Sequence, residues 1–302
     1  MSRRRLVEAW SAFWFRPEAR TNLAIARVVI AATALWIVLS RYDLPSALLF
    51  PREIWDSVVP ERKMRFFLFF SVAAERILWM ALHVTLTACI AGIATRWAAI
   101  VSGLLLYHFS AFETLLWTGN PYLRGFTIPV LGLLIIGASA SGGDFAKRAD
   151  ADRASGENRW PLALIQVLFV QVYFFAAWAK LYTSGLEWMH PENIRRYIIA
   201  IDQWTGAFPS PVNRFIIETP ALAAAIAVGG VVFEASFPLV LISRRARMIL
   251  LPAAVFFHIA NGIVFHIWFQ NAWILLIFVD WHGLMQRRRI AACRKSSISY
   301  AT

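Results

Sequence analysis

Residues 23–39 read LAIARVVIAATALWIVL, an apolar run with a single charge, Arg27. A run of this length and hydropathy predicts a helix that crosses a lipid bilayer, because about 20 apolar residues span the hydrocarbon core. Similar runs recur to the end of the chain, and we predict about eight spans in an all-α, polytopic transmembrane helix bundle. The predicted spans cover residues 23–39, 77–94, 98–117, 125–141, 160–182, 220–242, 248–265 and 269–283.

The composition of the 302 residues is that of a membrane protein, with 59% hydrophobic and only 16% charged residues. Soluble domains carry about a quarter charged residues. A net charge of +12 would suggest nucleic acid as a partner of a soluble protein, but here the arginines lie between apolar runs. We therefore expect the lipid bilayer as partner and no nucleic acid. Cys89 and Cys293 are both expected on the cytoplasmic side, where disulfides are rare, so no disulfide partner is predicted.

The basic residues predict the orientation of the spans. If the N-terminus is cytoplasmic, eight spans place every short basic turn on the cytoplasmic side, as positive-inside retention requires. Both termini are then cytoplasmic. These turns and the tail contain Arg96, residues 147–159, residues 244–247 and residues 287–295.

This topology divides the chain into three parts. We predict a basic cytoplasmic N-terminus (1–20), a transmembrane domain (21–284) and a basic cytoplasmic tail (285–302). The stretch 188–217 is amphipathic and is expected to lie along the membrane interface.

Several polar side chains lie inside the predicted spans. A charge near the bilayer centre costs at least about 2.5–3.5 kcal/mol, so each such charge needs a partner or a purpose. The predicted topology gathers several of these groups, together with polar residues just beyond the span ends, between the middle and the outer face, where they could line an outward-facing cavity. The group comprises Glu113, Asn120, Arg124, Lys180, Glu234, His258, Asn261, His266 and Gln270.

Each of these residues can also be explained by a purely structural role, and the functional and the structural interpretations both stay open. Lys180 lies near the end of its span and could extend its ammonium to the headgroups. Glu234 is either half of an interhelical ion pair or an acid or base in a site. His258, Asn261 and His266 share roughly one helical face and could simply form interhelical hydrogen bonds. No HExxH motif occurs, and we predict no metal site.

The segment QVYFFAAWAKLYTSGLEWM (171–189) resembles a signature of vitamin K-dependent gamma-carboxylases. It is also similar to their bacterial relatives, the HTTM (horizontally transferred transmembrane) domain proteins. Further segments match in order and spacing over nearly the whole chain. They are RPEARTNLAIARVVIAATAL (16–35), WTGNPYLRG (117–125), VVFEASFPLVLISRRAR (231–247) and FFHIANGIVFHIWFQNAWILLIFVDW (256–281).

The resemblance implies a role for Lys180. In the carboxylases, the lysine at this position removes a proton from reduced vitamin K, and oxygenation of that hydroquinone yields a strong base that acts on a glutamate side chain. A lysine base needs a lowered pKa, and an apolar bundle containing Phe174, Phe175 and Trp178 beside Lys180 could provide it. The chain departs from the carboxylases at Asn120, which replaces a functional histidine, at Ala179, which replaces a lysine, and in the lack of a lumenal domain.

We therefore expect an integral protein of a bacterial cytoplasmic (inner) membrane that acts on a lipid-soluble quinone or a peptide. The resemblance implies a carboxylase- or oxygenase-like lyase with a reduced, vitamin K-like quinone as cofactor. The alternatives are a non-enzymatic membrane partner for the maturation of a secreted peptide, as in the sporulation-delaying system, and, ranked lower, a transporter. The candidate catalytic residues are Lys180, Glu234 and His258, and the candidate substrate-binding residues are Asn120, Arg124, Tyr173, Asn261 and His266.

Overall fold

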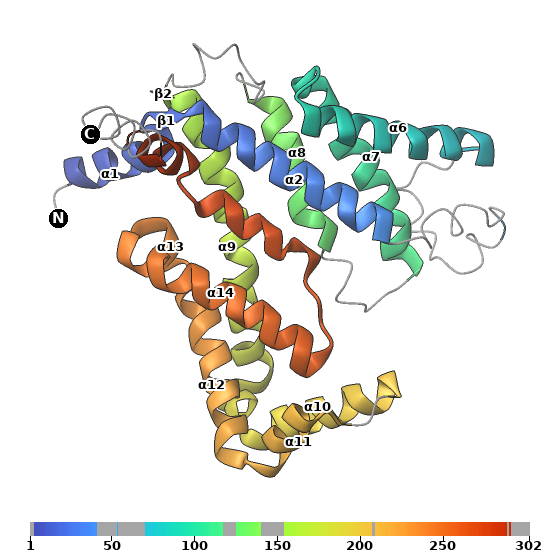
Figure 1. Ribbon diagram of the computed structural model, residues 1–302, viewed down its shortest axis with the longest axis vertical. Helices are drawn as coiled ribbons and strands as arrows, with labels where there is room; N and C mark the ends of the chain where they lie inside the picture. The colour runs from blue at the N-terminus through green and yellow to red at the C-terminus, as the bar shows by residue number, and fades with distance from the viewer. Residues whose placement is uncertain are drawn as a thin grey trace, which may run out of the picture. The chain divides into compact units, whose positions relative to one another are not determined.

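The described residues form helices joined by turns, with one short pair of strands among them (Figure 1). The computed structural model describes residues 3–40, 53, 70–116, 125–139, 154–206, 209–288 and 290, and for residues 111–116 and 205 it describes the backbone alone. Two compact units are present. Unit 1 contains Met1–Ile165 and Leu276–Thr302, and unit 2 contains Gln166–Leu275.

Unit 1 is built around α2, which packs against α6 and α8, while α7 packs against both of these neighbours. Its core consists of aliphatic and aromatic side chains such as Ile30, Leu86, Phe109 and Leu133, all fully buried. The elements are α1 (Arg3–Phe15), β1 (Glu18–Ala19), α2 (Arg20–Ser40), α6 (Val72–Ala91), α7 (Thr95–Leu116), α8 (Thr127–Ala138), β2 (Ala154–Ser155), the start of α9 (Gly156–Ser184) and a final helix at 281–288.

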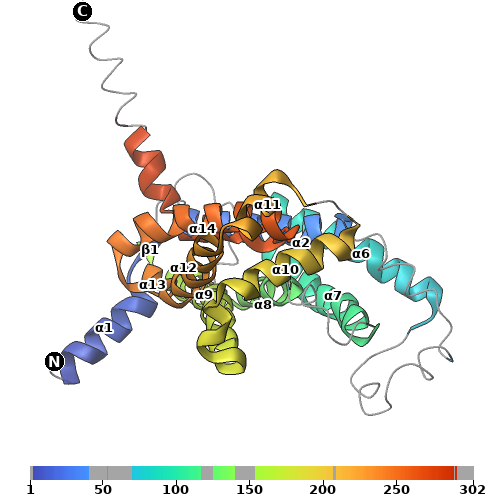
Figure 2. The ribbon, with the colours of Figure 1, turned by 90° about the horizontal axis from the view of Figure 1, so that it is seen from below.

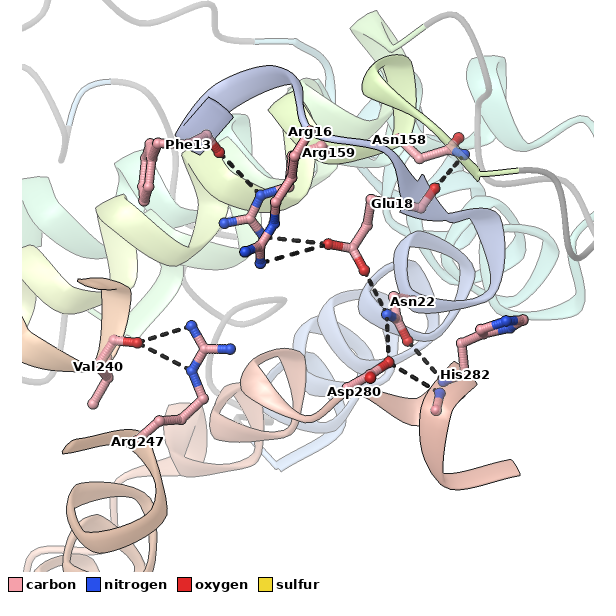
Figure 3. A network of polar contacts seen from close by, with 11 residues as sticks. Phe13, Arg16, Glu18, Asn22, Asn158, Arg159, Val240, Arg247, Asp280 and His282 are labelled. Atoms are coloured by element: carbon pink, nitrogen blue, oxygen red, sulfur yellow. Dashed lines mark hydrogen bonds and ion pairs between the residues drawn. The ribbon is translucent and has the colours of Figure 1, made fainter. Parts of the chain in front are cut away.

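A polar network in unit 1 joins segments that are far apart in sequence (Figure 3). The Glu18 carboxylate accepts hydrogen bonds from Asn22 Nδ2 at 2.7 Å and from Arg159 Nη1 at 3.5 Å. Asn22 also donates to Asp280 at 3.2 Å and accepts from the backbone N–H of His282 at 3.0 Å. The starts of α2 and α9 and the end of the chain's last apolar segment are thereby fastened together.

Unit 2 contains the rest of α9 and a series of shorter helices. Where α10 and α11 meet the ends of α12 and α14, a small apolar core forms from Ile194, Ile198, Ile216, Ala223, Ala227 and Val264. The elements are η2 (Gly185–Met189), α10 (Pro191–Thr205), α11 (Pro211–Glu218), α12 (Pro220–Ser236), α13 (Leu239–Ile242), α14 (Arg244–Phe265) and η3 (Gln270–Phe278), which runs on into unit 1.

The all-α class and the membrane-protein composition are confirmed, while the span count stays a prediction. Among the described residues, four helices are long and apolar enough to cross a membrane: α2, α6, α9 continued by η2, and α14. A fifth is counted if α11 and α12, which meet at a 99° bend, form one span. The 12-residue α8 and the 9-residue η3 lie where two further spans were predicted, and both are shorter than about 20 residues.

The helix boundaries differ from the predicted spans in a regular way. α2, α6, α9 and α14 each begin three to five residues before the predicted apolar run. Hydropathy marks only the part of a helix that suits lipid, whereas the helix itself starts at its N-cap. Ser71 and Ser243 provide such caps, accepting backbone hydrogen bonds at the starts of α6 and α14. The span predicted for 220–242 is broken before α13, because Pro238 cannot donate to a continuing helix.

The close approach of α8 to α7 predicts a sensitive position at Gly137. A Cβ there would lie 2.4 Å from Ile100 Cγ1 and 3.1 Å from the backbone oxygen of Arg96. We expect Gly137→Val to destabilise the protein by about 1–3 kcal/mol through overpacking. Thermal unfolding in detergent measures this effect. Gly229→Val is the matched control, since nothing lies within 4 Å of a Cβ at that helical glycine; equal effects of the two substitutions would contradict the prediction.

Candidate functional site

Lys180 and Glu234 form an ion pair between α9 and α12. The ammonium Nζ donates to both carboxylate oxygens of Glu234, each at 2.5 Å. The carboxylate side chain is buried, at 5% exposed, whereas the lysine side chain is 24% exposed. The pair thus has one end deep in the protein and the other within reach of its surface.

Tyr173 and His258 form a second polar pair in the same unit. The Tyr173 hydroxyl and Nε2 of His258 are 2.6 Å apart, which links α9 to α14. Tyr173 lies two turns before Lys180, so both side chains project from the same face of α9. Phe237, the C-cap of α12, lies about one turn after Glu234 and packs on the Tyr173 ring at a centroid distance of 4.0 Å. The two pairs are therefore neighbours in one group of three helices.

Aromatic rings surround the Tyr173–His258 pair. Phe233 contacts Tyr173 and Phe257, with centroid distances of 5.8 and 4.8 Å. Phe269 packs against the imidazole of His258 at 5.1 Å. Among the described residues, Nδ1 of His258 is buried and has no hydrogen-bond partner. The imidazole thus keeps one nitrogen available inside an aromatic enclosure.

A pocket of about 400 Å³ opens at the end of α9. One of its walls is Trp188, whose ring centroid lies 5.7 Å from the Lys180 ammonium. An ammonium over an indole face is an attractive arrangement. Trp188 therefore borders the pocket and also lies beside the Lys180 ammonium. The other lining residues are Ser184, Glu187, His190, Glu192, Asn193 and Arg196.

The apolar neighbours expected around Lys180 are not there. Phe174, Phe175 and Trp178 are all exposed on the outside of α9. Their offsets of six, five and two residues place them on faces of the helix that point away from Lys180. The groups in contact with the ammonium are instead a carboxylate and an indole.

Asn261 and His266 do not join the two pairs through any hydrogen bond described here. Asn261 Nδ2 donates back to the Phe257 carbonyl of its own helix, at 2.7 Å. His266 is the C-cap of α14 in a left-handed conformation, with φ of 53°, so it does not continue the face of His258. Its Nε2 lies 3.7 Å from Asp202 on α10 instead. The prediction that His258 and His266 share one helical face is therefore wrong.

The candidate residues Asn120 and Arg124, and the side chain of Glu113, lie outside the residues that the structure describes. The predictions for them stay predictions. Within the described ranges, no three His, Cys, Asp or Glu side chains come together in a group that could hold a metal ion.

Two further polar pairs were not predicted from the sequence. Glu75 on α6 is buried and accepts from His108 on α7, with 2.9 Å between Oε2 and Nε2. Asn213 on α11 is also buried and donates to Asp202 and to the Val264 carbonyl. A signal for the first pair exists: Glu75 and His108 lie about equally far from the turn at Gly92, so an antiparallel hairpin places them at one depth.

The comparisons with known proteins give one match. The family model described as HTTM domain matches residues 15–281, which is most of the chain. No curated protein and no solved structure matches.

The burial of the Lys180–Glu234 pair predicts an asymmetric mutational response. Lys180→Met leaves a buried carboxylate unpaired and should destabilise the protein by about 3 kcal/mol. Glu234→Met should cost less, about 1 kcal/mol, because the partly exposed lysine can extend toward polar surroundings. The double variant should be more stable than Lys180→Met alone, as measured by denaturant unfolding in micelles. Additive losses would contradict the pairing.

The Tyr173–His258 contact predicts a separate loss. Tyr173→Phe removes the hydroxyl from a partly buried imidazole and should destabilise the protein by about 1–2 kcal/mol. Tyr182→Phe, at an exposed tyrosine on the same helix, is the matched control and should have no measurable effect. If both variants melt like the wild type, the hydrogen bond contributes nothing to stability.

Proposed function

Since the chain belongs to the HTTM domain family, we propose that it is a membrane enzyme that uses the Lys180–Glu234 pair to take a proton from a lipid-soluble hydroquinone. The family match and the long apolar helices identify an integral membrane protein. The reaction, the substrate and the role of Lys180 are the proposal.

The observation that carries the proposal is the contact of Nζ with both oxygens of a buried carboxylate. A buried ion pair is a poor source of stability, because desolvation of two charges offsets their attraction. As a unit the pair carries no net charge, whether the proton resides on the amine or on the carboxyl. Uptake of one further proton gives an ammonium beside a neutral carboxyl. The positive charge of that unit would balance the anion left on the substrate.

The residues around the pair fit a hydroquinone. Phe233, Phe237 and Phe257 offer aromatic faces. Nδ1 of His258, which has no partner within the described part of the chain, offers a hydrogen bond to a ring hydroxyl or oxygen. When bound, a reduced quinone would supply an acidic hydroxyl and the reducing electrons. Tyr173 would hold the imidazole in place through Nε2, and Glu234 would hold the lysine. Lys180 would first pass its ammonium proton to Glu234, and the neutral amine would then accept the proton of the hydroxyl.

The proposal includes the topology that positions the pair. With about eight spans and both termini cytoplasmic, α9 runs outward and its end, with the pocket beside Trp188, lies near the extracytoplasmic face. A bacterial cytoplasmic membrane provides both a pool of lipid-soluble quinones and anionic lipids. In this arrangement the substrate ring would come from the lipid, and the pocket would admit a second, polar reactant such as a peptide side chain.

Loss of the base tests the proposal directly. Lys180→Ala should lower oxygen-dependent quinol consumption in proteoliposomes by about 100-fold or more, the usual contribution of a general base. Lys180→Arg should be as inactive, because a guanidinium does not give up its proton. Phe175→Ala, at an exposed position on the same helix, should keep wild-type activity. Wild-type turnover in both Lys180 variants would overturn the catalytic role.

A non-enzymatic membrane partner is the second candidate. The observation that favours it is that the polar pairs join α9 to α12 and to α14, so they could serve only to hold these helices together. Glu234→Gln separates the two functions, because the amide can still accept a hydrogen bond from Lys180. A folded but inactive variant supports the enzyme. A variant that still matures a peptide encoded by a neighbouring gene supports the partner.

A further inference from the structure

We propose that α1 lies in the plane of the membrane, docked on a leaflet that contains anionic phospholipid. The helix is amphipathic: Leu6, Trp10 and Phe13 share one face with Val7 and Trp14. No residue of α1 is buried in the fold. Such a helix needs an apolar surface to cover the face it presents.

The apolar face of α1 is open over its N-terminal part, whereas Phe13 and Trp14 near its end are partly buried. Leu6, Val7 and Trp10 are 54%, 61% and 66% exposed. The rings of Trp10 and Trp14 pack edge to face at 5.7 Å, which makes a continuous aromatic surface. In Figures 1 and 2, α1 leads outward from β1, with only its C-terminal end near the other helices of unit 1.

The charge of the segment identifies the partner. Arg3, Arg4 and Arg5 begin the helix, and Arg16 and Arg20 follow it. Basic residues beside an apolar helical face are the combination that binds anionic lipid surfaces, where headgroups attract the arginines and the apolar face enters the interface. Binding to a water-soluble protein would not explain why both the apolar face and the flanking arginines lie directly before a candidate membrane span.

The polar network fixes the end of α1 close to that surface. Arg159 donates from Nε to the Phe13 carbonyl at 3.1 Å, and its guanidinium lies 5.5 Å from the Phe13 ring centroid. The same arginine contacts Glu18, which lies in β1, two residues before the start of α2. Because α2 is a candidate span that begins at Arg20, α1 ends where the chain enters the membrane.

The experiment uses the full chain in vesicles and an environment-sensitive NBD label. Cys293 is replaced by Ser, buried Cys89 is kept, and the label is attached at Val7→Cys or, as a control on the opposite face, at Ala12→Cys. In phosphatidylcholine vesicles containing phosphatidylglycerol, we expect about twofold or higher, blue-shifted emission at position 7 and water-like emission at position 12. The Arg3→Gln/Arg4→Gln/Arg5→Gln variant should lose most of that difference.

The other outcomes overturn the proposal. Water-like emission at position 7 in phosphatidylcholine vesicles both with and without phosphatidylglycerol means that α1 does not dock on lipid. Shielding at position 7 that ignores phosphatidylglycerol and rises with the protein-to-lipid ratio means that a second copy of the chain covers the face. The Lys180 site plays no part in this test, so its fate is independent of that of the proposed function.

Discussion

Charged and polar side chains inside an apolar layer must find partners, and this constraint organises the structure. Separating a charge from water without compensation costs several kcal/mol, far more than most single contacts contribute. Three of the pairs described above meet that demand across a helix boundary: Lys180 with Glu234, His108 with Glu75, Asn213 with Asp202. The helices are held in register by these pairs, and apolar packing fills the space between them.

The same constraint explains why the candidate site has its form. Tyr173 and Lys180 project from one face of α9, so α12 and α14 must provide the complementary groups at matching heights. Glu234 pairs with the Lys180 ammonium, and His258 forms a hydrogen bond with the Tyr173 hydroxyl. Of these groups, His258 keeps a buried nitrogen without a partner among the described residues. Ligand sites combine apolar and aromatic walls with a few polar groups, and the aromatic rings around this nitrogen match that pattern.

How far the sequence predicts this arrangement depends on the range of the interaction. Helices were predictable because hydropathy is a local property, and the runs 23–39 and 248–265 lie within α2 and α14. Their ends were less predictable, since caps such as Ser71 lie outside the apolar runs. Lys180 and Glu234 can be identified as candidates from the sequence because a charged residue inside an apolar span is unusual. Their contact cannot be predicted in the same way, because it joins two helices that are far apart in sequence.

Local geometry limited the prediction at two further positions. Asn261 was expected to turn toward the site, yet a carbonyl one turn back in its own helix is a nearer acceptor. His266 was placed on the face of His258 by helical periodicity, which ends when the chain adopts a left-handed cap. Glu75 and His108 were missed because neither is unusual alone. They form a pair only because the hairpin of α6 and α7 places them at the same depth.

The proposed reaction requires the Lys180–Glu234 pair to change its protonation when a hydroquinone binds. Infrared difference spectroscopy measures this on the full chain in lipid, with a reduced naphthoquinone added to wild-type protein and to Glu234→Gln. A carboxyl C=O band that appears on binding in the wild type and is absent from Glu234→Gln is the predicted result. Binding without any change in the carboxylate bands would contradict the account.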